Sequence, residues 1–409
     1  MNLVRRIFPL CIILFLGYFG FSLTLPLFPA LFLNTNTYFL SLSITKQTRQ
    51  ILLGILLAMY PLGQFIGAPI LGKWSDKYGR KPILLISLII LVPAYFTSAI
   101  AILYAQPVLL FISRFFTGLL AGDIVIAQAA VADTSKDVTT KTKSFGWLMF
   151  FGSTAFFFGP LIGGSLADST VVSWFHYETP FFCAAILSIV SFIVVALLFQ
   201  ETHKADRNIE ISLRTLFYTF GEGFKSSHLR IFFIANFFMY LAIFFFLNFF
   251  SAYLIVVYRF SVAALGRVNA YFSVPMIAVP FVCSRFNDRW SVKSVMQVIS
   301  FFLGISYIIF VLFQSSWSLL FTLIPISFFI GFGLVFSSIL ISDAVDSGFQ
   351  GQALGINQSV LVLAEALTAV LGGFCISLLN TSFFYIAFVC SILVFFILFC
   401  AKKQNTLSL

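Results

Sequence analysis

Charged residues are scarce in this chain. They make up 9% of its 409 residues, whereas soluble globular proteins carry about 25%. By contrast, 60% of the residues are hydrophobic and the mean hydropathy is +1.05. A chain with so few charges excludes a soluble enzyme, a secreted domain and a nucleic-acid-binding protein. We therefore expect an integral membrane protein whose main partner is the lipid bilayer.

Residues suited to metal or covalent chemistry are equally few. The three histidines, His176, His203 and His228, all lie in connections between apolar segments. The six cysteines are scattered through apolar segments without a Cys-x-x-Cys pair, the spacing typical of zinc and redox sites. We therefore expect no catalytic residues, no metal ligands and no cofactor.

Long apolar segments are what the chain has in abundance. About twelve can be traced, at roughly 8–33, 50–71, 83–103, 107–132, 144–167, 180–200, 230–256, 268–284, 294–313, 318–341, 353–375 and 382–401. A helix of about 20 residues, rising 1.5 Å per residue, crosses a hydrocarbon core of about 30 Å. The first segment follows two arginines as a signal peptide would, but prolines stand where a cleavage site is expected. The sequence predicts an all-α membrane protein with twelve transmembrane helices, the first one retained.

Positive charge follows alternate connections. With the N-terminus inside, the inner connections hold nineteen Lys and Arg residues and the outer ones hold four. Cytoplasmic loops are enriched in these residues, so both termini are expected in the cytoplasm, with the inner membrane of a bacterium as the expected location. The net charge of +10 needs no acidic protein partner, because basic loops beside anionic lipid account for it.

The longest polar stretch divides the chain nearly in half. Residues 1–200 and 230–409 are expected to form two six-helix halves, and 201–229 a cytoplasmic linker. The linker is either a short helix on the membrane surface or a solvated connector.

The two halves repeat one another. Three glycines of the fifth segment recur 209 residues later in the eleventh, and one aspartate recurs after 212 residues. The pairs are Gly146 and Gly355, Gly163 and Gly372, Gly164 and Gly373, and Asp76 and Asp288. Such a duplication suits a carrier that rocks one half against the other around a central site.

The connection after the second segment carries the most specific motif. It reads Gly72-Lys-Trp-Ser-Asp-Lys-Tyr-Gly-Arg-Lys81, which resembles the G-x-x-x-D-[RK]-x-G-R-[RK] signature of the major facilitator superfamily at every specified position. Within that superfamily it is similar to the twelve-helix drug:proton antiporters, which include the tetracycline efflux proteins. The resemblance implies a latch in which Asp76 meets the eleventh helix near Gly351 when the cytoplasmic side closes. A basic topology anchor is the alternative. The latch residues are Gly72, Asp76, Lys77, Gly79, Arg80, Lys81 and, in the second copy, Asp288.

Two helix motifs extend the resemblance. Arg114 and Gly118 are similar to an R-x-x-x-G element to which the family assigns a part in proton coupling. The fifth segment resembles the antiporter motif that the family links to export, with Ala155 replacing one glycine; its members are Gly146, Gly159, Pro160, Gly163 and Gly164. Generic helix packing through small residues is the alternative.

The first helix departs from the tetracycline-type pattern. Gly17 stands where those relatives have an acidic residue, so a first-helix proton carrier is missing. The acids well inside predicted helices are Asp123 and Glu365, and a carboxylate there costs a few kcal/mol. Both are therefore candidates for protonation or substrate contact, the alternative being a neutral, hydrogen-bonded acid buried between helices.

The expected proton and substrate pathway consists of Arg114, Asp123, Glu365, Gln358 and Tyr18. Nine residues separate Arg114 from Asp123, which places them on opposite faces of a straight helix, about 13 Å apart. A direct ion pair is therefore not expected unless the helix bends near Gly118 and Gly122.

These observations favour a secondary transporter that exports a small apolar or amphipathic compound in exchange for protons, and that acts as a monomer. A facilitator or nutrient symporter of the same superfamily is the nearest alternative, because Gly17 weakens the analogy with antiporters. A membrane sensor that does not transport is the alternative from another class.

Overall fold

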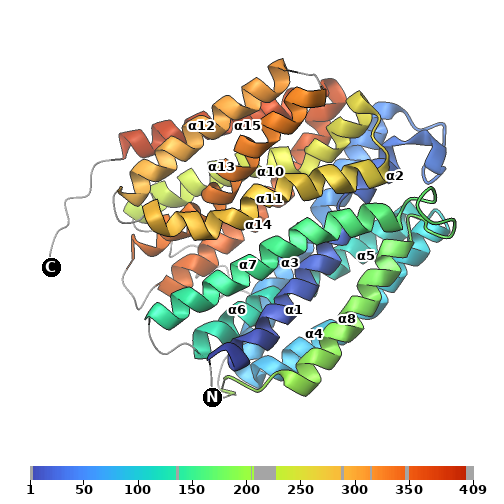
Figure 1. The fold of residues 1–409 in the computed structure, drawn as a ribbon. Coiled ribbons are helices and arrows are strands. Elements are labelled where there is room, and N and C mark those ends of the chain that lie inside the picture. Colours follow the sequence, from blue (N-terminus) through green and yellow to red (C-terminus); the bar gives the residue numbers. More distant parts are fainter. Residues whose placement is uncertain are drawn as a thin grey trace.

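The computed structural model describes residues 3–134, 138–203, 205–206, 227–286, 290–313, 316–345 and 350–401. The chain forms a bundle of long helices (Figure 1). The first group comprises α1 (Leu3–Leu23), α2 (Leu27–Leu33), the short 3-10 turn η1 (Thr35–Thr37), α3 (Lys46–Tyr78), α4 (Arg80–Leu103), α5 (Pro107–Leu119), α6 (Asp123–Thr134), α7 (Val138–Leu166) and α8 (Thr179–Leu198). The second group comprises α10 (Ser227–Tyr258), α11 (Val262–Phe286), α12 (Val292–Leu312), α13 (Ser316–Ser342), α14 (Gln350–Leu378) and α15 (Ser382–Cys400).

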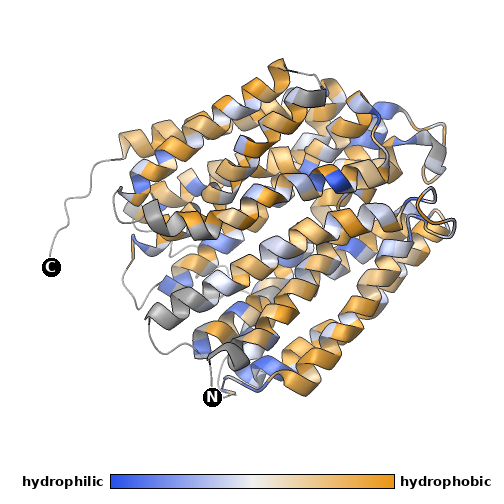
Figure 2. Ribbon diagram, viewed as in Figure 1, coloured by the Kyte–Doolittle hydropathy of each residue, from blue (hydrophilic) through white to orange (hydrophobic). Residues whose placement is uncertain are grey.

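Eleven spans of the described chain are long and apolar enough to cross a membrane, and the shorter apolar helix α5 adds to them. Apolar residues cover the outer faces of both groups along most of their length (Figure 2). The prediction of an all-α, multi-pass membrane protein is confirmed. The predicted surface helix of the linker lies outside the described residues.

Two predicted segments are not single helices. The segment 8–33 divides into α1 and α2 around Thr24–Pro26, because Pro26 has no amide hydrogen and its ring disfavours helix in the preceding residue. The segment 107–132 divides into α5 and α6 at Leu120–Gly122. There the amide of Gly122 donates to the carbonyl of Leu120 at 2.7 Å in a tight turn instead of continuing the helix. The expectation of one continuous helix was wrong in both places.

Both termini lie at one end of the bundle, opposite the connection between α2 and α3 (Figure 1). We call these ends the termini side and the distal side. Within the first group α1 packs on α7 and α8, and α4 packs on α5 and α8. Within the second, α10 packs on α14 and α15, and α12 packs on α13 and α15.

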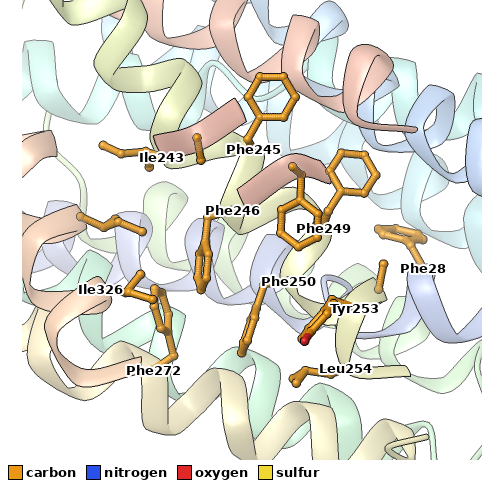
Figure 3. Packing of buried hydrophobic residues seen from close by; sticks show 14 of the residues in the cluster. Phe28, Ile243, Phe245, Phe246, Phe249, Phe250, Tyr253, Leu254, Phe272 and Ile326 are labelled. Carbon is orange, nitrogen blue, oxygen red and sulfur yellow. The ribbon is translucent and has the colours of Figure 1, made fainter. Parts of the chain in front are cut away.

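The second group has an aromatic core. Phe246 of α10 stacks on Phe250 with ring centroids 4.9 Å apart and on Tyr307 of α12 at 5.5 Å, and Figure 3 shows these α10 rings packed in a row. The hydroxyl of Tyr307 donates to the carbonyl of Ala242 at 3.0 Å. These stacked, buried rings give this half a well-packed interior.

Candidate functional site

The two groups meet through glycines. A Cβ added to Gly54 of α3 would lie 2.7 Å from the Cα of Gly373 in α14, and one added to Gly164 of α7 would lie 2.9 Å from the Cα of Gly266 in α11. Backbones can approach this closely only where side chains are missing. Gly54 and Gly266 are 212 residues apart and Gly164 and Gly373 are 209 apart, so the repeat places one glycine pair at each of two equivalent contacts.

These contacts lie toward the distal side, between the first part of α3 and the last part of α14 and between the last part of α7 and the first part of α11. Nearby, the amide of Gln50 donates to Asn380 at 3.2 Å, which adds a neutral hydrogen bond between the halves. Toward the termini side, a Cβ on Gly72, Gly146 or Gly355 would meet no described atom within 4 Å. Within the motif of the fifth segment, Gly164 contacts the other half, whereas no described atom lies within 4 Å of a Cβ placed at Gly146.

Pro160 has a specific effect on α7. A proline inside a helix leaves the carbonyl four residues earlier without its helical donor, and that carbonyl belongs to Phe156. The hydroxyl of Ser273 in α11 donates to it at 3.0 Å. Meanwhile Gly159 and Gly163 pack on Ser22 and Leu23 of α1, so the motif joins α7 to one helix in each half.

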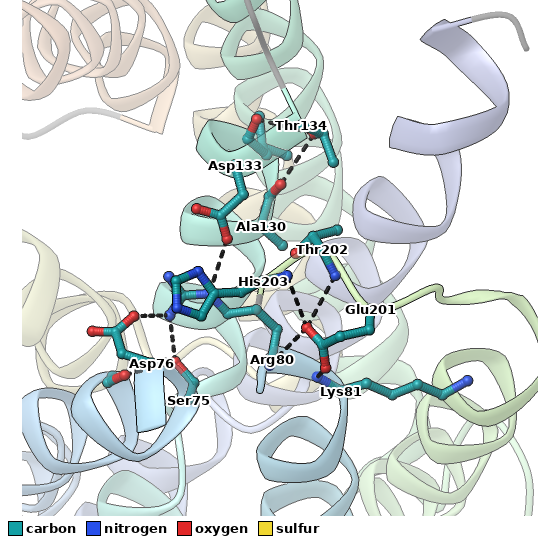
Figure 4. Close-up of polar contacts among 12 residues, drawn as sticks. Ser75, Asp76, Arg80, Lys81, Ala130, Asp133, Thr134, Glu201, Thr202 and His203 are labelled. Atoms are coloured by element: carbon teal, nitrogen blue, oxygen red, sulfur yellow. Dashed lines mark hydrogen bonds and ion pairs between the residues drawn. The ribbon is translucent and has the colours of Figure 1, made fainter. Parts of the chain in front are cut away.

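A polar cluster holds the termini side of the first half together (Figure 4). Arg80 is its centre: its Nη1 lies 2.6 Å from a carboxylate oxygen of Asp76 and its Nε lies 3.1 Å from one of Asp133. Nη1 also donates to the hydroxyl of Ser75 at 2.5 Å. The guanidinium therefore ties α3, α4 and α6 to one another. Lys77 extends over the ring of Tyr78, 5.9 Å from its centroid.

Glu201, after α8, completes this cluster. Its two carboxylate oxygens accept from the backbone amides of Arg80 and Lys81, each at 3.0 Å, at the N-terminus of α4, where a negative charge is favoured. Burial opposes ionisation, but these amides and those of Thr202 and His203 outweigh it and lower the pKa of Glu201. A Cβ on Gly79, whose φ is +101°, would lie 2.7 Å from Glu201, so glycine is required here.

The predicted latch residues are thus placed within one half. Among the described contacts Asp76 pairs with Arg80 only, and the ammonium of Lys81 donates to the carbonyl of Ala196 in α8 at 2.8 Å. Asp288 lies outside the described residues. Asp343 stands 210 residues after Asp133, and burial raises its pKa. Among the described residues of the second half, no ion pair corresponds to the one between Arg80 and Asp133.

Arg114 is enclosed by aromatic rings. The side chain is 2% exposed, and its Cζ lies 5.0 Å from the ring centroid of Phe28, 5.1 Å from that of Tyr60 and 6.0 Å from that of Phe21. Asp123 is the first residue of α6, but its side chain lies outside the described part. The expected distance of about 13 Å between Arg114 and Asp123 assumed one straight helix. Because the chain breaks between α5 and α6, that distance no longer applies.

Glu365 lies on the face of α14 that continues from the distal contact. Ala369 and Gly373 of this face touch Gly54, and Glu365 is one turn further toward the termini side. Among the described residues its carboxylate forms no hydrogen bond or ion pair, while its backbone carbonyl accepts from Asn248 at 3.4 Å. Gln358, two turns further, is exposed. Glu365 corresponds to Phe156 in the repeat, since 209 residues separate them.

Tyr18 lies on the other half. Its ring packs on that of Phe156 with centroids 5.4 Å apart, and Gly152 of α7 leaves room for it. The structure thus brings Tyr18 and Arg114 to the first half and Glu365 and Gln358 to the second.

Comparison with known proteins decides the family. The family model described as Major Facilitator Superfamily matches residues 10–268 and, overlapping, 232–406. The chain belongs to the Major Facilitator Superfamily. This confirms the resemblance that the loop motif predicted.

Relatives within the superfamily include resistance proteins. The tetracycline resistance protein, class B, of Escherichia coli is 37% identical over 161 residues, which cover 38% of this chain and 37% of that protein. The class H protein of Pasteurella multocida is 27% identical over 72% of this chain and 70% of its own length. The chain therefore spans little more than a third of the first relative. The human organic anion transporter MFSD10 (TETRAN) has the same fold, with a TM-score of 0.75, 18% identity and coverage of 97% of this chain and 100% of the other.

Several residues that build this superfamily site were not predicted from the sequence. The rings around Arg114 are among 56 phenylalanines, and nothing in their spacing separates them from lipid-facing ones. Gly54 and Gly266 could have been found, because their offset of 212 residues equals that of Asp76 and Asp288. Ser273 could not, since only the fold brings it to the carbonyl that Pro160 frees.

Proposed function

We propose that this protein exports a small apolar or amphipathic compound in exchange for protons by alternating access. Two relatives carry resistance names that fit export: the class B tetracycline protein already described and multidrug resistance protein 1 of Bacillus subtilis (strain 168), 30% identical over 54% of this chain and 50% of that protein. The observation that carries the proposal is Glu365, an acid within a membrane span, one turn from the contact that Ala369 makes with Gly54 of the other half.

The excess of Lys and Arg in alternate connections supports a cytoplasmic termini side. On that orientation the glycine contacts lie toward the outside, which supports a conformation closed on that side. We further propose a bacterial inner-membrane protein that works as a monomer, with halves 1–200 and 230–409 and a linker of 201–229.

Glu365 is proposed as the proton carrier, with Asp123 as a second candidate. Asp76 is proposed as a latch that leaves Arg80 to engage α14 when the termini side closes. One proton moving down 100 mV yields about 2.3 kcal/mol, which sustains roughly a fiftyfold gradient of a neutral compound.

The test is transport by the full chain in proteoliposomes. Compounds that raise the melting temperature of the purified protein, beginning with tetracycline, are used as substrates. We expect a pH gradient to drive their accumulation in wild type, and Glu365→Gln to abolish that accumulation while keeping exchange without a gradient. Glu178→Gln, an acid outside the spans, is the control and should behave as wild type. Gradient-driven accumulation by both Glu365→Gln and Asp123→Asn would contradict the proposed carriers.

A facilitator or symporter remains the second candidate function, and Gly17 is the residue that favours it. Counterflow with and without a pH gradient separates the two. Counterflow that does not change with the pH gradient identifies a facilitator. Substrate accumulation in the direction of proton flow identifies a symporter.

A further inference from the structure

Arg114 has an unsatisfied hydrogen-bond donor in the interior of the first half. Its Nη1 is buried without a hydrogen-bond partner, and among the described residues no carboxylate lies within ion-pair distance of its guanidinium. A buried donor left open costs about 1–3 kcal/mol, and more when charged. The rings of Phe21, Phe28 and Tyr60 stabilise a cation through their faces, but these face contacts are not a hydrogen bond to Nη1.

Arg49 shows what this fold does with a structural arginine. It too is 2% exposed, yet its guanidinium donates to four backbone carbonyls. These belong to Phe32 (3.3 Å), Leu40 (3.1 Å), Ser41 (2.8 Å) and Ile44 (3.3 Å). The Nη1 of Arg114 has no such backbone acceptor. It therefore requires an acceptor from a bound molecule.

A series of rings connects Arg114 with the boundary between the halves. Phe21 lies 4.5 Å from Tyr60 and 6.2 Å from Phe156, measured between ring centroids, and Phe156 lies 5.4 Å from Tyr18. Phe21, Phe156 and Tyr18 are only partly buried. Phe156 is at the boundary itself, because its carbonyl accepts from Ser273 of the other half.

We propose that Arg114 and these rings bind the transported compound, and that this compound is an organic anion with an aromatic or apolar body. Its carboxylate, or an equivalent acidic group, pairs with the free edge of the guanidinium, whose planar fork suits two oxygens. Its body packs against Phe21, Tyr60 and Phe156. The anion supplies the counter-charge that Arg114 lacks among the described residues. This inference rests on the proposed passage of cargo between the halves.

Binding of two matched probes tests the proposal without any gradient. 2-Naphthoate carries a carboxylate, and 2-naphthamide has the same rings and a neutral head. Titrated calorimetrically into the full chain in lipid nanodiscs at pH 7, naphthoate should bind wild type about 10- to 100-fold more tightly, the ratio expected for a charge-assisted hydrogen bond. Arg114→Gln should weaken naphthoate binding more than naphthamide binding and so remove this preference. Arg267→Gln, an exposed arginine of the distal side, is the control and should keep the preference.

Phe21→Leu gives an independent arm, because it retains the guanidinium. It should weaken both probes by a similar factor and keep naphthoate the tighter ligand. Equal binding of the two probes to wild type overturns the anion site, and so does a preference that persists in Arg114→Gln. The comparison of the two probes on the wild-type protein tests the proposal even if a variant fails to fold.

The result is separable from that of the transport test. Preference for naphthoate together with pH-independent flux would support the anion site and contradict proton exchange. Proton-driven flux together with equal binding of the two probes would support proton exchange and contradict the anion site.

Discussion

Arg80 shows how much one side chain can hold together in this protein. Its guanidinium reaches carboxylates of two helices, and its backbone amide reaches a third segment through Glu201. The loop motif identified Arg80 and Asp76. It could not identify Asp133 and Glu201 as partners, because contacts over 53 and 121 residues leave no trace in local spacing.

We predict that Glu201 makes the fold sensitive to acid. The folded state lowers the pKa of Glu201 below its unfolded value, which is near 4.5. The ionised carboxylate therefore stabilises the fold at pH values above 4.5, and this stability is lost as the pH falls through the lower, folded-state pKa. The melting temperature of wild type should therefore drop on acidification below about pH 4.5. Glu201→Gln should melt lower at pH 7 and lose less on acidification.

Glu178→Gln is the matched control for this measurement. A parallel loss of melting temperature in wild type and Glu201→Gln on acidification would show that the amide contacts of Glu201 do not stabilise its ionised form in solution.

At the scale of helices, the positions of spans were predictable and their interruptions were not. Apolar runs fixed the spans because the bilayer demands length. The break between α5 and α6 depends on packing: Gly118 lies on the backbone of Tyr60 and Gly122 on Leu71, both in α3. A glycine is compatible with a helix or a turn, so its sequence position did not decide between them.

The glycine contacts predict a shift between conformations. Gly164→Leu would push α7 from α11, and overpacking costs about 1–3 kcal/mol. We expect the distal side to open, so that a Gln50→Cys reporter in a cysteine-free background reacts with a membrane-impermeant maleimide about fivefold faster or more.

Gly146→Leu is the control within the same motif, because no described atom stands near it. It should leave the reaction rate unchanged. Equal rates in both variants would mean that the contact between Gly164 and Gly266 does not keep the distal side closed.

Pro160 and Ser273 should act as a pair. Pro160→Ala returns an amide to the carbonyl of Phe156, and Ser273→Ala removes the donor from α11. Each single change should raise the reactivity of the Gln50→Cys reporter. The double variant should be no more reactive than either single one, since both remove the same hydrogen bond. Additive increases would assign the two residues to separate effects.

At the scale of the whole molecule, the duplication could be predicted from the sequence because glycines and an aspartate recur at nearly constant offsets. The conformation could not be predicted, since one sequence encodes every state of a carrier. Asp76 illustrates this: the motif implied contact with α14, and the structure pairs Asp76 with Arg80 in its own half.

We predict that Asp76→Asn folds but does not transport. The Asp76 side chain is 39% exposed, and a pair of this kind contributes about 0–1 kcal/mol to stability, so the melting temperature should change little. Loss of the charge should abolish most substrate flux in proteoliposomes, whereas Lys73→Gln, at an unspecified position of the loop motif, should retain it. Normal flux in Asp76→Asn would leave the loop as a topology anchor.

The distal closure has a consequence for the way the cycle responds to its surroundings. The contacts described there consist of glycine backbones, the amides of Gln50 and Asn380 and, deeper, the hydroxyl of Ser273. None of these groups titrates, and none carries a charge that salt could screen. The strength of this seal should therefore be the same in acidic and neutral medium and at low and high ionic strength. Any dependence of the cycle on those conditions must originate at the opposite end or in the middle of the bilayer, so that one gate senses the environment and the other does not.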